Sequence, residues 1–224
     1  MISTLVIRGE RPRGAAADLD HSVELLRAVA SGTIGDDRVV RVYAPLPTVA
    51  MSRRESRMPG FERACTTAVD CGFTPVIRPT GGRAVAYDET CIVFDIIERE
   101  HALTDQSTFF RRVGDALAAA MRRLGVDAHV GDVPGEYCPG EFSINARGAV
   151  KLIGTSQRAV RGARLLSGML PLGEVAHLAD VLVEVNAALG LDWDSATFGT
   201  LRAEASGLAR TVVEDAVVGA LIEM

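Results

Sequence analysis

Apolar residues recur along the chain with two spacings, one that predicts strands and one that predicts amphipathic helices. Alternating or β-branched runs predict strands over residues 3–8, 38–43, 48–51, 74–78, 83–87, 91–97, 126–130, 142–145, 150–154 and 165–172. Apolar positions three or four residues apart predict helices over residues 18–30, 59–70, 105–124, 174–189, 193–205 and 210–222. The polar segment 53–58 is expected to be a loop, and residues 146–148 are expected to join two strands as a hairpin.

Strands and helices are mixed along the chain without strict alternation, which is typical of the α+β class. No internal repeat and no low-complexity linker divides the 224 residues. We therefore expect one α+β domain over residues 1–224, a length that is sufficient to bury a single main core.

Composition and charge fit an ordinary soluble protein and argue against two kinds of partner. Hydrophobic residues make up 48% of the chain and charged residues 24%, and the longest apolar runs are too short to cross a bilayer. Residues 1–9 lack the basic start and apolar stretch of a signal peptide, so we expect a cytoplasmic protein that does not bind membranes. The net charge of −5 argues against general nucleic-acid binding, which needs a basic face.

The four cysteines have no CxxC spacing and no histidine at a metal-ligand spacing, so neither a metal site nor a disulfide framework is predicted. Cys65 and Cys71 fall on a predicted apolar helix, and Cys91 begins an apolar strand, so each is expected to be a small buried residue. Cys138 differs because it lies in a turn, residues 137–140 (YCPG). A thiol in such a loop is a candidate nucleophile, although a packing role alone also fits the pattern.

The four histidines are weaker candidates for catalysis. His21 and His177 fall on predicted amphipathic helices, His101 lies in a polar turn, and His129 lies on a predicted strand. Each is expected to be structural or surface-exposed rather than a general base.

The pair Gly81-Gly82 lies between two predicted strands, in the segment 78–88 (RPTGGRAVAYD). Paired glycines let the backbone turn tightly and approach a ligand closely, because they have no Cβ. The same pair also suits a plain hairpin turn, so the pattern alone leaves both interpretations open.

Lys151 is the only lysine among the 24 basic residues, since all the others are arginine. An amine differs from a guanidinium because it is a compact charge that can lose its proton when it is desolvated. Strand alternation would place Lys151 and Ile153 on one face and Leu152 on the other, which puts the amine beside an apolar wall. The alternative is a lysine left over from a biased composition on a solvated face.

These stretches, in this order, resemble the catalytic domain of the lipoate ligase and octanoyltransferase family, which shares its fold with the biotin protein ligases. The Gly-Gly motif of the family is matched by Arg78, Thr80, Gly81, Gly82, Ala84, Val85 and Asp88. The lysine motif is matched closely by Lys151, Gly154, Ser156, Gln157 and Arg158, and loosely by Gly148. The resemblance implies a mixed, mainly antiparallel sheet flanked by helices.

Two features of the chain separate the branches of the family. The ATP-dependent ligases usually have a third glycine and a His-Asp pair, where this chain has Arg83 and Tyr87-Asp88, and many carry a further C-terminal domain for which 224 residues leave no room. The Tyr-Cys-Pro-Gly turn looks instead like the cysteine-dependent octanoyltransferase branch. In that branch the cysteine carries the acyl group, which implies that Cys138 is the nucleophile and that Lys151 contacts the acyl carbonyl.

The resemblance implies an acyltransferase that moves an octanoyl or lipoyl group, through a Cys138 thioester, to a lysine of another protein. The implied partners are the lipoyl domains of 2-oxoacid dehydrogenases, the glycine cleavage H protein and acyl carrier protein, with no tightly bound cofactor and no metal. Substrate contacts are implied for Arg78, Thr80, Gly81, Gly82, Arg83, Ala84, Asp88, Gly154, Thr155 and Gln157. Two alternatives stay open: a lipoate ligase that uses ATP, magnesium and Lys151 without a covalent cysteine, and a non-catalytic acyl-binding relative.

Overall fold

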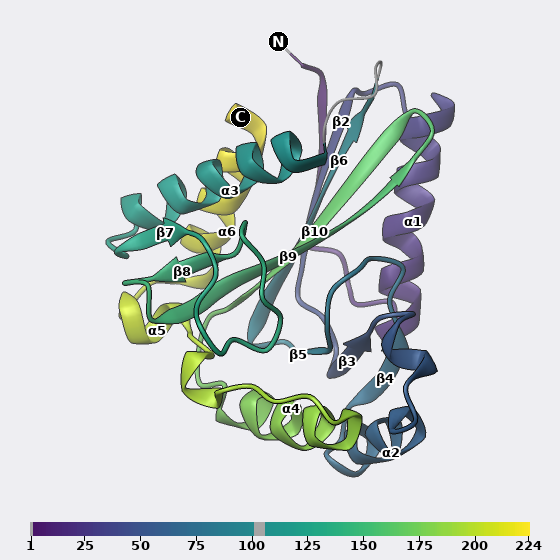
Figure 1. The fold of residues 1–224 in the computed structure, drawn as a ribbon. Helices are drawn as coiled ribbons and strands as arrows, with labels where there is room; N and C mark the ends of the chain where they lie inside the picture. Colours follow the sequence, from purple (N-terminus) through teal and green to yellow (C-terminus); the bar gives the residue numbers. More distant parts are fainter. Residues whose placement is uncertain (1, 101–105) are drawn as a thin grey trace.

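A computed structural model describes residues 2–100 and 106–224 of the chain, so the predicted turn at His101 and the predicted helix start at residue 105 lie outside the described residues. Seven strands form a sheet in the order β1-β2-β6-β10-β9-β8-β7 (Figure 1). Their bounds are β1 Thr4–Arg8, β2 Arg38–Tyr43, β6 Cys91–Arg99, β7 Ala128–Val130, β8 Ile144–Ala146, β9 Val150–Val160 and β10 Ala163–Pro171. β1 pairs with β2 in parallel, and the other neighbouring strands of this sheet pair antiparallel.

A second sheet has three strands in the order β4-β3-β5. β3 spans Thr48–Met51, β4 spans Thr74–Ile77 and β5 spans Val85–Tyr87. β3 pairs with β4 in parallel and with β5 antiparallel. The prediction of a mixed, mainly antiparallel α+β arrangement is therefore confirmed, with the strands divided between two sheets.

Helices cover both faces of the larger sheet (Figure 1). α1 (Ala15–Ser31) buries apolar side chains such as Leu26 against one face, and α3 (Gln106–Arg123) and α6 (Arg210–Glu223) cover the other. α2 (Phe61–Asp70) and α4 (Ala176–Leu189) pack against the smaller sheet. Within residues 2–100 and 106–224, none of the helices has the length and apolar character needed to span a membrane.

The helix predicted over residues 193–205 is two short elements instead. They are a 3₁₀ turn at Ser195–Thr197 and the helix α5 at Leu201–Glu204. Each begins at its own cap, because the Asp194 side chain accepts a hydrogen bond from the Ala196 N–H and the Thr200 hydroxyl accepts one from the Arg202 N–H. Two capping residues of this kind favour two separate helix starts.

Two further segments are more ordered than their sequence predicts. The predicted loop 53–58 contains a 3₁₀ turn at Glu55–Arg57, because the Glu55 carboxylate accepts hydrogen bonds from the N–H and the hydroxyl of Ser52. The strand predicted to end at residue 154 continues to Val160, because its later residues pair with β10. The longer strand brings the second half of the lysine motif into the sheet.

The four cysteines are free thiols in different settings. Cys91 is buried on β6, and its burial raises the pKa of the thiol to about 12. Cys65 is half-buried on α2, and Cys71 is exposed. The prediction that Cys71 is buried is wrong, because it follows the last residue of α2 as the C-cap instead of lying on the apolar face.

Candidate active site

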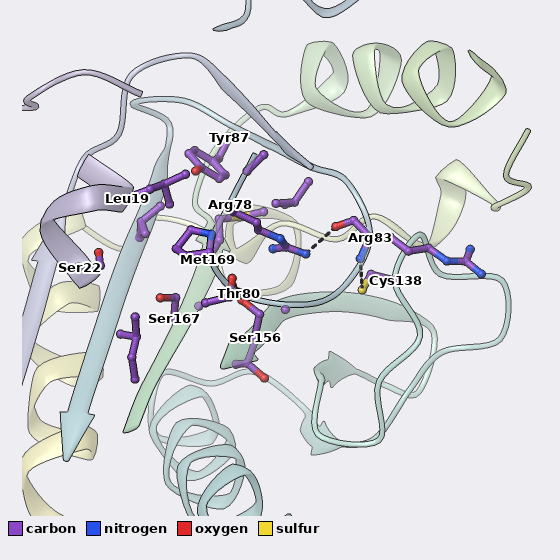
Figure 2. Close-up of a pocket in the computed structure, with 18 of the residues that line it drawn as sticks. Leu19, Ser22, Arg78, Thr80, Arg83, Tyr87, Cys138, Ser156, Ser167 and Met169 are labelled. Carbon is purple, nitrogen blue, oxygen red and sulfur yellow. Dashed lines mark hydrogen bonds between the residues drawn. The ribbon is translucent and has the colours of Figure 1, made fainter. Parts of the chain in front are cut away.

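A cavity lies between α1, the segment 78–85, the loop that carries Cys138, and the strands β9 and β10. We call this space the inner cavity. Figure 2 shows Arg83 and Cys138 at one end of it and Leu19 and Ser22 at the other. Its apolar walls are formed by Leu19, Ala50, Val85, Val93, Leu165 and Met169. Apolar walls with a few polar groups at the ends are typical of a small-molecule pocket.

Cys138 lies on the loop between β7 and β8 and is half-buried. Its Sγ accepts a hydrogen bond from the backbone N–H of Arg83 at 3.2 Å. Its carbonyl oxygen accepts a hydrogen bond from Lys151 Nζ at 2.6 Å. A donor directed at sulfur stabilises negative charge on it, and the thiolate is the nucleophilic form of cysteine. The structure thus brings together the two residues predicted to be catalytic.

Glu136 is the buried counterion of Lys151, and sequence reasoning missed it. Lys151 is 4% exposed, and its Nζ lies 3.0 Å from Glu136 Oε1. The same carboxylate accepts hydrogen bonds from the N–H groups of Val133 and Gly140 and from the Ser143 hydroxyl. Glu136 therefore fixes both the lysine and the loop around Cys138. The sequence did offer one signal for this pair. Glu136 lies two positions before Cys138, and a buried ammonium such as that of Lys151 needs a carboxylate partner.

A β-bulge changes the orientation predicted for Lys151. Asn145 pairs with Lys151, but the next residue of β8, Ile144, pairs with Ile153, so Leu152 is an extra residue in β9. Leu152 and Ile153 both join the main core, while Lys151 and Gly154 line the inner cavity. The prediction that Lys151 shares a face with Ile153 beside an apolar wall is therefore wrong, because the bulge interrupts the strict alternation of the strand.

Two glycines lie in close packing with the cysteine and the lysine. Gly82 has φ +99°, and a Cβ there would lie 3.2 Å from Cys138 Sγ and against the Arg78 guanidinium. That guanidinium donates a hydrogen bond to the Arg83 carbonyl at 2.6 Å. At Gly154, a Cβ would lie 3.1 Å from the Cε of Lys151. Close backbone approach, rather than a plain hairpin turn, therefore explains the glycine at position 82.

Polar side chains cross the larger sheet in one row beneath α1. The register aligns Arg41 on β2, Asp95 on β6, Ser167 on β10 and Ser156 on β9 as direct neighbours. The hydroxyls of Ser167 and of Ser22 on α1 donate to the Asp95 carboxylate at 2.5 and 2.6 Å. Burial raises the pKa of Asp95 even though these hydrogen bonds act to lower it. Ser22 and Ser167 line the inner cavity, on the side away from Cys138 (Figure 2), and we call this the polar end of the cavity.

The remaining predicted contact residues divide into three groups. Arg78, Thr80, Arg83, Gly154 and Thr155 line the inner cavity, and Gly81 and Gly82 line a second recess outside it. Ala84 and Gln157 line neither of these two spaces: the Ala84 N–H donates to Glu55, and the buried Gln157 Oε1 has no hydrogen-bond partner among the described residues.

Asp88 lies away from the inner cavity and stabilises a turn. Its carboxylate accepts hydrogen bonds from the N–H and hydroxyl of Thr90 and lies 2.5 Å from His177 Nε2. Although burial acts to raise it, these contacts leave the pKa of Asp88 below its usual value. The position of Asp88 thus gives its predicted substrate contact no support, and His177 has a structural partner, as expected.

The fold is that of the lipoate-protein ligases. A crystal structure of lipoate-protein ligase A bound with ATP superimposes with a TM-score of 0.78 at 18% identity, over 99% of this chain and 85% of that one. An archaeal bi-partite lipoate protein ligase from Thermoplasma acidophilum gives a TM-score of 0.76 at 18% identity, over 100% of this chain and 84% of that one. These similarities establish the fold.

The sequence places the chain in a particular family. Residues 16–194 match the family model of the lipoyl protein ligase A/B catalytic domain, and the chain belongs to this family. A relative from Anoxybacillus flavithermus, named octanoyl-[GcvH]:protein N-octanoyltransferase, is 31% identical over 62% of this chain and 49% of its own length. A relative of the same name from Geobacillus kaustophilus is 27% identical over 68% of this chain and 58% of its own. The chain matches about half the length of these curated relatives.

Proposed function

We propose that the chain is an acyltransferase that holds an octanoyl or lipoyl group on Cys138 and passes it to a lysine of a second protein. The observation that carries the proposal is the position of Cys138 at one end of an apolar cavity, between the Arg83 N–H and the Lys151 ammonium. An acyl chain in the inner cavity would have its carbonyl carbon beside the sulfur. The residues present supply a nucleophile and cationic stabilisation.

The reaction then has two half-reactions. The sulfur of Cys138 attacks the acyl carbonyl of the donor, a C–S bond forms, the bond to the donor's leaving atom breaks, and the thiol proton goes to that atom. The neutral amine of the acceptor lysine next attacks the thioester. A C–N bond forms, the C–S bond breaks, and an amine proton returns to the Cys138 sulfur. Each of the two steps through the covalent intermediate has a lower barrier than a direct exchange between the two proteins would have.

Lys151 would stabilise the negative charge that develops on the acyl oxygen. An ammonium has three N–H donors, and two of them are used by Glu136 and by the Cys138 carbonyl. Within residues 2–100 and 106–224 the third donates no hydrogen bond, so it would be available for the acyl oxygen. Preorganised donors of this kind contribute about 2.7–4 kcal/mol to transition-state stabilisation.

Relatives named octanoyl-[GcvH]:protein N-octanoyltransferase support an H protein as donor and a second protein as acceptor. We propose a lipoyl domain as that acceptor, the kind of domain with which the archaeal ligase of the same fold is described. Acyl carrier protein is a second candidate donor. The proposed chemistry uses only residues of this chain and its two protein substrates, so no bound cofactor is required. We also propose that residues 1–224 act as one catalytic domain in the cytoplasm, because a reducing compartment keeps the Cys138 thiol free.

The test is intact-mass analysis after incubation with an octanoylated H protein and a lipoyl domain, with and without ATP. We expect one octanoyl group on Cys138, located by peptide mapping, and its transfer to the lipoyl domain in the absence of ATP. Modification of the lipoyl domain that requires ATP and leaves Cys138 free would support the ligase alternative. Octanoic acid binding without any transfer would support a non-catalytic relative.

The polar end of the inner cavity, at Ser22 and Ser167, is expected to limit the acyl chain length. Ser167→Val replaces the hydroxyl beside Asp95 with two methyl groups, a net gain of one heavy atom at that end. One methylene more or less in an apolar pocket is worth roughly 1–3 kcal/mol, so we expect acylation by octanoyl donors to fall about tenfold relative to butanoyl donors. Ser167→Ala removes the hydroxyl without adding bulk and is the matched control. The measurement is the rate of Cys138 acylation by thioesters of four to ten carbons. If the acylation rate of Ser167→Val depends on acyl chain length as it does in the wild type, this end of the cavity does not limit the chain length.

A further inference from the structure

A second recess lies outside the inner cavity and shares its entrance. Pro79, Thr80, Arg83 and Cys138 line both spaces, so Cys138 lies at the boundary between them. A Cβ placed on Gly81 would meet no atom within 4 Å, which shows that the recess is open at the glycine loop. If the acyl chain fills the inner cavity, the molecule that carries the chain must occupy this outer recess.

Three arginines line the outer recess: Arg53, Arg54 and Arg83. We call them the arginine collar. Arg53 and Arg54 are exposed and Arg83 is half-buried, and Figure 2 shows the Arg83 side chain pointing away from the inner cavity, past Cys138. None of the three forms an ion pair within residues 2–100 and 106–224.

The acidic residue that lines the same recess does not offer its carboxylate to the collar. Glu55 is 3% exposed, and its oxygens accept hydrogen bonds from Ser52 and from the Ala84 N–H. Arg41, by contrast, is buried and paired with Asp18. In a protein of net charge −5, unpaired arginines at the mouth of the cavity therefore create a local positive field.

We propose that the arginine collar docks the acidic surface of an acyl-carrying protein, with the acyl group reaching Cys138 from the outer recess. The proposal rests on the acyltransferase function above. Because donor and acceptor must both reach one sulfur, both use the same recess in turn, and both are selected by the same charge. Positive potential at a cleft raises the association rate of an oppositely charged partner, and the effect is screened by salt.

The test compares a protein-borne acyl donor with a small one. Arg53→Glu/Arg54→Glu reverses two exposed charges and leaves Arg83, whose N–H bonds the cysteine, unchanged. Arg27→Glu/Arg161→Glu is the matched control, because both arginines are exposed and neither lines the two spaces. Acylation of Cys138 is followed by intact mass with an octanoylated acidic H protein and with S-octanoyl-N-acetylcysteamine. Deacylation of the octanoyl enzyme is then followed with an acidic lipoyl domain.

The collar variant is expected to lose at least about tenfold in kcat/KM in both protein half-reactions, and its acylation by the small thioester should stay within about twofold of wild type. The control pair should match wild type in all three assays. Added salt should slow the wild-type protein reactions and should have little effect on those of the collar variant. Equal losses with protein and small donors, or no loss with either, would overturn the proposal.

A binding measurement that involves no acyl transfer tests the docking proposal independently of the acyltransferase function. In a Cys138→Ala background, the acidic H protein should bind, and the collar variant should weaken that binding by about tenfold. Absence of binding, or equal affinity for an H protein whose surface carboxylates have been replaced by amides, would overturn the docking proposal even if transfer occurs. Binding that depends on the collar without any acylation of wild-type Cys138 would instead retain the docking surface and overturn the acyltransferase function.

Discussion

Cys138→Ala is expected to fold like the wild type and to lose octanoyl transfer by about 10³-fold or more, because it removes the atom that forms the covalent intermediate. The sulfur is half-buried and accepts one backbone hydrogen bond, so its removal should cost only about 1 kcal/mol of stability. Transfer is measured as the initial rate of lipoyl-domain octanoylation, and folding is measured by urea denaturation. Cys138→Ser should be similarly inactive, since a hydroxyl gives almost no anion at neutral pH.

Other thiols of the same chain provide the matched controls. Cys65→Ala and Cys71→Ala remove a half-buried and an exposed thiol from α2 and its end, and both variants should retain wild-type transfer. Cys91 is unsuitable as a control because it is part of a buried core cluster. Transfer by Cys138→Ala at a wild-type rate without ATP would exclude the thioester route, whereas transfer restored only by ATP would assign the activity to a ligase.

The sequence was sufficient to locate the hairpin that carries Lys151. The hairpin of β8 and β9 follows from two apolar runs around Arg147 and Gly148, and these two residues have positive φ in the turn. Lys151 and Cys138 could be paired because the resemblance supplies their order along the chain. The pair Gly81-Gly82 left close backbone approach and a plain hairpin turn both open in the sequence, and only the contacts of Gly82 in the structure decide between them.

The features that could not be predicted depend on register. The bulge at Leu152 adds one residue to β9, and nothing in the alternation of apolar residues marks it. The row from Arg41 through Asp95 to Ser167 joins three strands that are far apart in sequence, so only the pairing of those strands brings it together. Glu136 lies beside the cysteine motif, but its role as a counterion becomes visible only when Lys151 is found to be buried.

Lys151→Arg is expected to lose transfer by about 10²-fold or more, because one oxyanion donor is misplaced. The Lys151 Nζ fits between Glu136, the Cys138 carbonyl and the Tyr137 ring, whose centroid lies 4.8 Å away. A guanidinium is larger and planar, and overfilling a buried site costs about 1–3 kcal/mol of stability. Urea denaturation and the rates of both half-reactions measure the two effects separately. Full activity in this variant would show that an amine is not needed at this position.

Substituting Lys151 together with its counterion Glu136 distinguishes a structural role of the lysine from a catalytic one. Lys151→Met leaves the Glu136 carboxylate buried without a cation, which should cost about 3–5 kcal/mol of stability. Lys151→Met/Glu136→Gln replaces the ion pair with neutral groups of similar size, so most of that stability should return, while transfer should stay at least about 10²-fold below wild type. Glu136→Gln alone leaves the Lys151 ammonium buried without a carboxylate, so it measures the cost of losing the counterion when the amine is kept. Recovery of transfer together with stability in the double variant would mean that the lysine acts only through folding.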